Sequence, residues 1–280
     1  MGLLRLLRPR QWIKSSFVLA PLLFSAQFTE PAAVMNALLA TVMFSLVASA
    51  TYIVNDLRDI ETDRRHPIKS RTRPLASGEV TPVAALALLG VLTVLVGAGL
   101  LRLPALAPPL LAYVAVSLSY TLWLKRQPVI DLFTIAFLFV LRVYAGAAAI
   151  DVEVSSWMFV TTFCLALYLA AIKRRQELII WGSDAREVLK LYTVSLIDRY
   201  AAMAATGALL FYSLYVLGEH PDMIITIPFV LYGIFRYWFL VELRQGGESP
   251  TELLLSDWQL LLTIAIWAGV CGWVLTGSPG

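Results

Sequence analysis

The chain has 280 residues, of which 59% are hydrophobic and only 15% are charged, and its mean hydropathy is +0.75. A soluble domain usually has about 25% charged residues, so this composition excludes an ordinary soluble globular protein. The formal net charge of +3 is small, and the distribution of the charges is more informative than their sum.

Apolar runs recur from end to end of the chain, and a helix needs about 20 apolar residues to cross the hydrocarbon core. Because backbone groups in lipid must be satisfied within their own segment, each run predicts a helix. In chain order we expect nine membrane-spanning helices, at 15–31, 34–55, 82–101, 105–124, 129–149, 156–173, 200–218, 222–241 and 258–276. The predicted fold class is an all-α integral membrane protein, a bundle of nine transmembrane helices forming one domain over 1–280.

Two segments between the predicted helices are polar, charged and long, at 56–80 and 173–199. Twenty of the 22 lysines and arginines lie in these segments, before the first predicted helix, or at other connections on the same side of the membrane. The positive-inside rule therefore places the N-terminus and this face in the cytoplasm. With nine crossings, the C-terminus lies outside. We expect a multi-pass protein of the inner (plasma) membrane, whose site is capped by the two polar segments.

The chemistry is predicted at the end of the second helix. Asp56, Asp59 and Asp63 are spaced by three and four residues, so they share one stripe if the helix continues, and Asn55 lies on the same stripe. Carboxylates gathered in this way repel one another unless a cation lies among them. Oxygen ligands of this kind suit Mg²⁺, which commonly binds a diphosphate and stabilises its departure. The alternative is a solvated acidic segment paired with its own arginines.

Basic residues surround the aspartates on the same face, as a phosphorylated substrate would require. Arg10 and Lys14 precede the first predicted helix, and Lys173 and Arg174 end the sixth. The segment after the aspartates adds further cations, among them Arg58, Lys69, Arg71 and Arg73. Arg142 stands apart, inside the fifth predicted helix, where a charge is costly and commonly functional; a substrate phosphate and a buried acid are both possible partners.

The pattern Asn55-Asp56-x-x-Asp59-x-x-x-Asp63 in a nine-helix bundle resembles the first aspartate motif of the UbiA superfamily of membrane prenyltransferases. The resemblance implies magnesium-dependent chemistry on a prenyl diphosphate. Members of that superfamily have a second aspartate-rich motif after the sixth helix. Here the matching place reads Ile172-Lys173-Arg174-Arg175-Gln176-Glu177-Leu178, with basic residues in place of the paired aspartates.

A subfamily accounts for that departure. The chain resembles the decaprenyl-phosphate phosphoribosyltransferases over nearly its whole length, in the segments Arg8-Pro9-Arg10-Gln11-Trp12-Ile13-Lys14, Asn55-Asp56-Leu57-Arg58-Asp59, His66-Pro67-Ile68-Lys69, Arg73-Pro74 and Lys173-Arg174 with Glu177-Leu178. The resemblance implies transfer of phosphoribose from phosphoribosyl pyrophosphate to a polyprenyl phosphate in the membrane, with release of pyrophosphate. The product is a precursor of cell-wall arabinan sugars.

The implied roles follow residue by residue. Asp56, Asp59 and Asp63 are the catalytic and metal-binding residues, with Asn55 as a fourth ligand of Mg²⁺. The implied substrate-binding residues are Arg10, Gln11, Lys14, Arg58, Lys69, Arg71, Arg73, Lys173, Arg174, Glu177 and Tyr192, with Arg142 as a further possibility. The resemblance permits a homo-oligomer, and we expect no nucleic-acid partner. Two alternatives stay open: a UbiA-type prenyltransferase acting on an aromatic or lipid acceptor, and a transporter or lipid-binding membrane protein.

Overall fold

The computed structural model describes residues 2–65, 68–182, 187–243 and 250–277. The regular structure of these residues is helical, and none of them forms a strand. The helices are α1 (Gly2–Leu6), η1 (Pro9–Leu19), α2 (Ala20–Phe24), η2 (Gln27–Thr29), α3 (Pro31–Arg58), α4 (Ile60–Arg65), α5 (Lys69–Thr72), α6 (Pro82–Arg102), η3 (Pro104–Leu106), α7 (Ala107–Leu122), η4 (Leu124–Arg126), α8 (Ile130–Ala149), α9 (Ser156–Trp181), η6 (Glu187–Leu191), α10 (Val194–Glu219), η7 (Pro221–Thr226), α11 (Ile227–Leu243), α12 (Pro250–Ser256) and α13 (Trp258–Gly277).

Eight helical stretches within the described residues are long and apolar enough to cross a membrane. They correspond to the second to ninth predicted helices: Pro31–Arg58, Pro82–Arg102, Pro104–Leu122, Ile130–Ala149, Ser156–Ile180, Val194–Glu219, Pro221–Leu243 and Trp258–Gly277. The prediction of an all-α membrane bundle is confirmed. The helices α6 and α9 begin at the predicted residues, because Pro82 occupies the first helical position and Ser155 accepts a hydrogen bond as the N-cap. The helix α10 begins six residues before the predicted start, where Thr193 is the N-cap.

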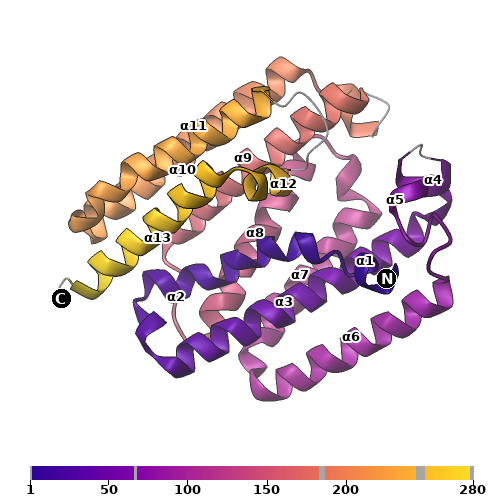
Figure 1. Ribbon diagram of the computed structural model, residues 1–280, viewed down its shortest axis with the longest axis horizontal. Coiled ribbons are helices and arrows are strands. Elements are labelled where there is room, and N and C mark those ends of the chain that lie inside the picture. The colour runs from indigo at the N-terminus through magenta and orange to yellow at the C-terminus, as the bar shows by residue number, and fades with distance from the viewer. Residues whose placement is uncertain (1, 66–67, 183–186, 244–249, 278–280) are drawn as a thin grey trace.

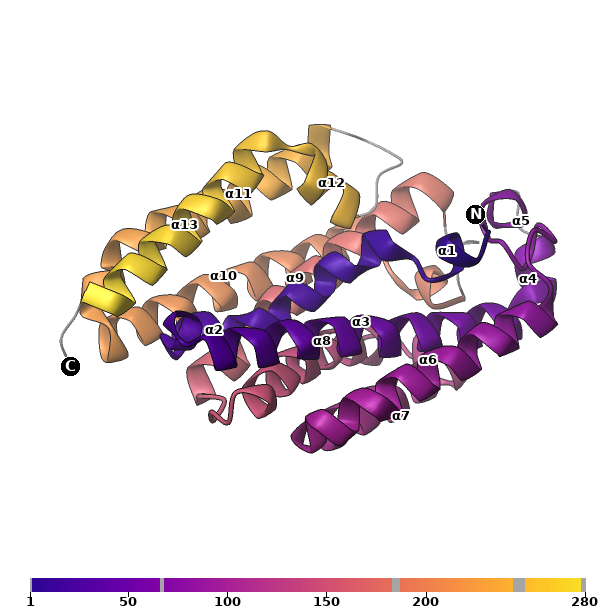
Figure 2. The same ribbon diagram turned by 60° about the horizontal axis from the view of Figure 1, so that its bottom comes forward.

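The first predicted helix, 15–31, is the one that differs. This part of the chain forms a broken crossing made of η1, α2 and η2, because Pro21 interrupts the backbone hydrogen bonding and Ala26 adopts a left-handed φ of 56°. The broken crossing nevertheless follows the length of the bundle beside α3 and α8 (Figure 2). It begins near the end of α3 and reaches the C-terminal half of α13, where Phe28 lies against Gly272.

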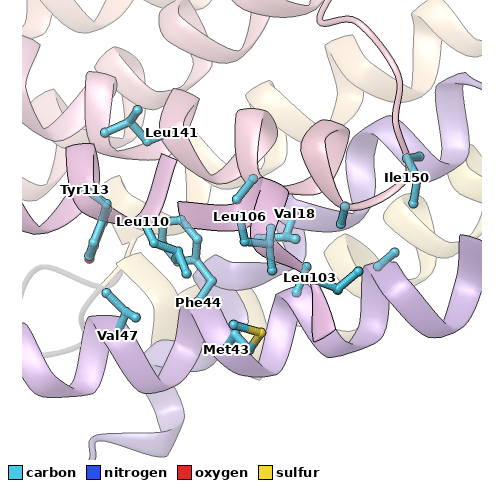
Figure 3. Close-up of a cluster of buried hydrophobic side chains, with 14 of the residues drawn as sticks. Val18, Met43, Phe44, Val47, Leu103, Leu106, Leu110, Tyr113, Leu141 and Ile150 are labelled. Atoms are coloured by element: carbon cyan, nitrogen blue, oxygen red, sulfur yellow. The ribbon is translucent and has the colours of Figure 1, made fainter. Parts of the chain in front are cut away.

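Two apolar cores hold the bundle together. One joins the broken crossing to α3, α7 and α8, and Figure 3 shows its side chains, with the rings of Phe44 and Tyr113 in edge contact at 4.6 Å between centroids. The other joins α9, α10 and α11 to α12 and α13, around Tyr168 and Tyr237. The helices pack side by side around these cores, and the polar connections lie at the two ends of the bundle.

One end of the bundle holds both polar segments. The N-terminus, α4 and α5 lie together at this end in Figure 1, and the C-terminus lies at the opposite end. Much of both segments is helical: 56–80 contains α4 and α5, and α9 continues to Trp181, past the predicted end at residue 173. The extra two turns of α9 place Arg174 and Glu177 on a rigid helix, where their side chains are fixed relative to the bundle.

Candidate active site

The site begins where α3 ends, with two nearly buried carboxylates. Asp56 in the last turn of α3 and Asp63 in α4 are 2% and 3% exposed. Arg73 Nη1 donates to Oδ1 of Asp56, at 2.8 Å, and to Oδ2 of Asp63. Arg8 Nη2 also donates to both oxygens of Asp56, at 2.6 and 2.7 Å. Two acids and two arginines therefore meet here, with Arg73 shared by both acids and Arg8 bound to Asp56, so the opposite charges are balanced in this arrangement.

Asp59 points to a different partner. The helix does not continue straight through the three aspartates: α3 ends at Arg58, Asp59 caps it with φ −91° and ψ 9°, and α4 starts afresh. Lys125, in the connection between α7 and α8, donates to Asp59 Oδ2 at 3.1 Å. The structure thus brings Asp56 and Asp63 together, as the spacing predicts, and turns Asp59 toward Lys125.

The end of α7 joins this cluster to a second one. Arg58 Nη1 donates to the carbonyl oxygen of Thr121 at 2.9 Å. The preceding residue, Tyr120, accepts a hydrogen bond from Arg174 Nη2 through its hydroxyl oxygen, at 2.7 Å. Thr121 therefore contacts the first cluster, and its neighbour Tyr120 contacts the second. Both clusters lie beside the same end of α7.

The second cluster is centred on Arg174, whose side chain has no exposed surface. Its Nε donates to Asp131 Oδ2 at 2.7 Å, and its Nη1 donates to Glu177 Oε2 at 2.6 Å. Lys173 approaches the other oxygen of Glu177 at 4.0 Å. All three guanidinium nitrogens of Arg174 thus donate to groups of the protein, and its charge is balanced by two carboxylates.

Tyr192 completes this cluster from the segment before α10. Its hydroxyl donates to Asp131 Oδ1 at 3.0 Å and accepts a hydrogen bond from the backbone N–H of Val129 at 2.6 Å. Burial raises the pKa of Tyr192 above the ordinary value of a phenol. The hydroxyl therefore keeps its proton at neutral pH and serves as a donor that fixes Asp131.

The remaining predicted residues lie around these clusters. Asn55 is half-buried in the last turn of α3, Gln11 is half-buried in η1, Arg10 and Arg71 are exposed, and Lys69 lies in α5. His66 and Pro67 of the predicted motif lie outside the described residues. Lys14 lies on η1, and Arg142 lies on α8 with its guanidinium against Phe44 and Tyr113, so neither belongs to the two clusters.

The fit of Mg²⁺ can be judged from the carboxylates. Within the described ranges, no three Asp, Glu, His or Cys side chains form a group able to hold a metal ion. Asp56 and Asp63 do converge on a single cationic nitrogen of Arg73, which occupies the place of a bridging cation. Carboxylate oxygens are the donors that Mg²⁺ prefers, so these two residues fit one divalent cation in place of the guanidinium.

Sequence reasoning did not single out several members of the site. Arg8 was noted only as part of the N-terminal motif, and Lys125 only as a basic residue on this face. The sequence does contain a signal that could have identified Asp131 as a paired acid, because an acid in the first turn of a transmembrane helix is costly unless it is paired. Its partner Arg174 is 43 residues away, and no spacing predicts that pairing.

Comparisons with known proteins show the family of the chain. The sequence profile described as the UbiA prenyltransferase family matches residues 16–256. The chain is 35% identical to a decaprenyl-phosphate phosphoribosyltransferase from Corynebacterium glutamicum, over 95% of this chain and 84% of that one. It is 34% identical to the protein of that name from Mycolicibacterium smegmatis, over 97% and 91%, and 33% identical to the one from Mycobacterium tuberculosis, over 97% and 93%.

Solved structures share the fold. A UbiA homolog from Archaeoglobus fulgidus bound to GPP and Mg²⁺ superimposes with a TM-score of 0.76 at 19% identity, over 99% of this chain and 100% of that one. A structure described as digeranylgeranylglyceryl phosphate synthase in membranes gives a TM-score of 0.65 at 17% identity, over 96% of this chain and 95% of that one. At these identities, the likeness establishes the arrangement of the helices.

Proposed function

The chain belongs to the UbiA prenyltransferase family of membrane transferases, and from that premise we propose that it transfers 5-phosphoribose from phosphoribosyl pyrophosphate to a polyprenyl phosphate. The curated relatives named decaprenyl-phosphate phosphoribosyltransferase support this reaction, because each aligns with nearly the whole chain. The acceptor by that analogy is decaprenyl phosphate, and the product is a precursor for cell-wall arabinan.

One observation favours phosphoribosyl transfer over prenyl transfer. The resemblance implies that a prenyl donor is held between two acidic motifs, the second of them after the sixth predicted helix. At that place in this chain, Arg174 is bonded to both Asp131 and Glu177. Arg174 has no exposed surface, whereas Arg8 and Arg73 beside the aspartates keep 27% and 21% of their side-chain surface exposed. The acids near α9 are therefore held by a cation that is enclosed on all sides, and they are the poorer ligands for a metal. A single acidic site with surrounding cations suits a substrate that carries several phosphates.

We infer that Asp56 and Asp63 would hold Mg²⁺, with Asn55 and Asp59 as further oxygen donors. Asp59 would have to exchange its contact with Lys125 for the ion. When bound, the ion supplies positive charge to the pyrophosphate of the donor and stabilises its departure. Arg73 and Arg8, released from the aspartates, are then free to bind phosphate oxygens. The catalytic roles assigned to these residues remain our proposal.

The transfer needs little acid–base chemistry. The bond between the anomeric carbon of ribose and the pyrophosphate oxygen breaks, and the electron pair leaves with pyrophosphate. An oxygen of the polyprenyl phosphate then forms the new bond to that carbon from the opposite side. Because the attacking oxygen is already ionised at neutral pH, no strong general base is required. The protein supplies position and charge, which are commonly the larger part of catalysis on phosphates.

The remaining assignments complete the proposal. Basic residues at this end of the bundle, among them Arg10, Arg58, Arg71 and Lys173, attract both substrates. We place this end and the N-terminus in the cytoplasm and the C-terminus outside, in the inner membrane, because the lysines and arginines gather at one end. The chain acts as one catalytic domain, with segments 56–80 and 173–199 covering the site.

A donor competition tests the proposal. Purified protein with Mg²⁺ receives labelled phosphoribosyl pyrophosphate and decaprenyl phosphate, and in parallel a labelled prenyl diphosphate with a phenolic acid. We expect label to enter the lipid phase only with the first pair, and only when Mg²⁺ is present. Product from the second pair alone would show that the chain is a prenyltransferase of the same family, which is the second candidate.

A further inference from the structure

Arg142 is a buried cation that contacts no acid among the residues that the structure describes. It lies in the middle of α8 and is 3% exposed. Its Nη1 donates to the carbonyl oxygen of Leu138 at 2.6 Å, and its Nη2 donates to the hydroxyl of Tyr113 at 3.2 Å. The rings of Phe44, Tyr113 and Phe139 each lie with their centroid 5.0 Å from its Cζ. Its Nε has no hydrogen-bond partner within the described ranges of the chain.

This arrangement differs from that of the other buried arginines. Arg174 and Arg175 each donate to two carboxylates, whereas no carboxylate among the described residues contacts Arg142. Aromatic faces attract a cation but do not neutralise it. An unpaired charge inside a membrane protein is costly and rare. A cation kept there, with a buried Nε that no described residue satisfies, indicates an anion that the described part of the protein does not supply.

Lys14 provides a second cation at the same place. It lies on η1, which packs against α8, and the positive charges of Arg142 and Arg8 both act on it. Arg8 in turn contacts Asp56 at the end of α3. Arg8, Lys14 and Arg142 thus form a line of positive charge that leads from the aspartates into the interior of the bundle.

The orientation of Arg142 fits this direction. Its side chain bends back by one turn to reach Leu138, so the guanidinium points toward the start of α8. The start of α8 is the end of the bundle where Asp131 and the aspartates lie. At 1.5 Å per residue, the guanidinium is about 12 Å along α8 from that end. A substrate group that extends inward from the aspartates would meet Lys14 first and Arg142 next.

We propose that Arg142 and Lys14 form a binding site for a phosphate monoester of a substrate, held inside the bundle below the aspartate cluster. The inference rests on the proposed function, because the 5-phosphate of the donor and the head group of the polyprenyl acceptor are both phosphate monoesters. Arginine offers two N–H groups in a plane to a phosphate, and lysine adds a point charge. The Tyr113 hydroxyl holds the guanidinium in place.

Binding without turnover tests the site and identifies its occupant. Purified protein in detergent, without Mg²⁺, is titrated with ribose 5-phosphate or with decaprenyl phosphate, and the midpoint of thermal unfolding is recorded. We expect one of the two probes to stabilise the wild type. Its dissociation constant should rise about tenfold or more in Arg142→Met and in Lys14→Met, the loss expected for one charge-assisted hydrogen bond. Arg142→Lys should recover part of the affinity.

Arg175→Met is the matched control, because Arg175 is also buried but is paired with Asp198 and Glu242. It should lower the thermal midpoint and leave the affinity for the probe unchanged, whereas Arg142→Met should leave the midpoint without probe unchanged or higher. Stabilisation of the wild type by neither probe, or equal stabilisation of wild type and Arg142→Met, would overturn the proposal. Prenyl transfer in the donor competition, with the phosphate site intact, would overturn only the proposed function.

Discussion

Asp131 and Arg174 form an ion pair in which neither side chain has solvent-accessible surface. Removing one member of a buried pair typically costs about 3–5 kcal/mol, and Glu177 remains as a second acid beside Arg174, so the lower end of that range applies to the loss of Asp131. We therefore expect Asp131→Asn to lower the free energy of unfolding by about 3 kcal/mol or more. The midpoint of thermal unfolding in detergent measures the loss. Asp198→Asn is the control, because the carboxylate of Asp198 is 35% exposed and water can replace it as a partner of Arg175. Equal effects of both substitutions would contradict the role given to burial.

Substitution of Asp56 or Asp63 should reduce the rate of transfer, whereas substitution of a neighbouring surface acid should not. We expect Asp56→Asn and Asp63→Asn each to reduce phosphoribosyl transfer by about a hundredfold or more, because each removes a ligand of the cation that neutralises the leaving group. Glu61 lies on α4 between them in sequence, but its carboxylate is 76% exposed and pairs with Arg64 at the surface. Glu61→Gln should therefore retain nearly the full rate. Comparable losses in all three variants would show that the transfer responds to charge in general and not to the two converging carboxylates.

Arg73 and Mg²⁺ should compete for the same oxygens. Without a metal, Arg73→Gln leaves Asp56 and Asp63 without their shared cation, so we expect the thermal midpoint to fall. Addition of Mg²⁺ should then stabilise Arg73→Gln more than it stabilises the wild type, because the ion no longer has to displace a guanidinium. Thermal unfolding with Mg²⁺ and with a chelator, in both proteins, gives the comparison. An equal gain from Mg²⁺ in the two proteins would mean that the ion does not bind between these carboxylates.

Gly146 permits the close approach of α8 and the first crossing. A β carbon built on Gly146 would lie 1.9 Å from the carbonyl oxygen of Val18, and a backbone atom cannot move aside as a side chain can. We expect Gly146→Ala to destabilise the protein by about 2 kcal/mol or more and to impair transfer, because it displaces the segment that carries Lys14. Gly97→Ala, on α6, has no atom within 4 Å of the added carbon and should leave stability and transfer unchanged. Transfer and thermal unfolding should be measured on both variants.

The sequence predicted the regular helices well because a membrane imposes a length and a composition on each crossing. The first crossing was predicted as a helix for the same reason and proved broken, since hydropathy does not report the left-handed turn at Ala26. The aspartate spacing predicted that Asp56 and Asp63 meet. It did not predict that Asp59 turns away to Lys125, because the partners of Arg58 and Asp59, Thr121 and Lys125, lie more than 60 residues further along the chain.

The sequence does not predict which residues form hydrogen bonds or ion pairs when they lie far apart in the chain. Arg174 is predicted to bind substrate, and the structure adds that its three nitrogens donate to Asp131, Glu177 and Tyr120, which no spacing indicates. The packing of whole helices decides which basic residues pair within the protein and which remain to bind a ligand. Arg142 illustrates the opposite case: its position within an apolar run marked it, and only the structure revealed that no acid neutralises it among the described residues.

The broken first crossing also bears on how the chain enters the membrane. Val18 packs on Gly146, which is synthesised much later. The segment that contains Ser15, Pro21 and Gln27 is a poor membrane helix on its own. A chain that ends before α8 should therefore leave a cysteine at Val18→Cys open to an aqueous thiol reagent, whereas the full chain should protect it. Labelling in both forms would decide the order. We expect the N-terminal segment to be synthesised first and to take its final place only after α8 has been inserted.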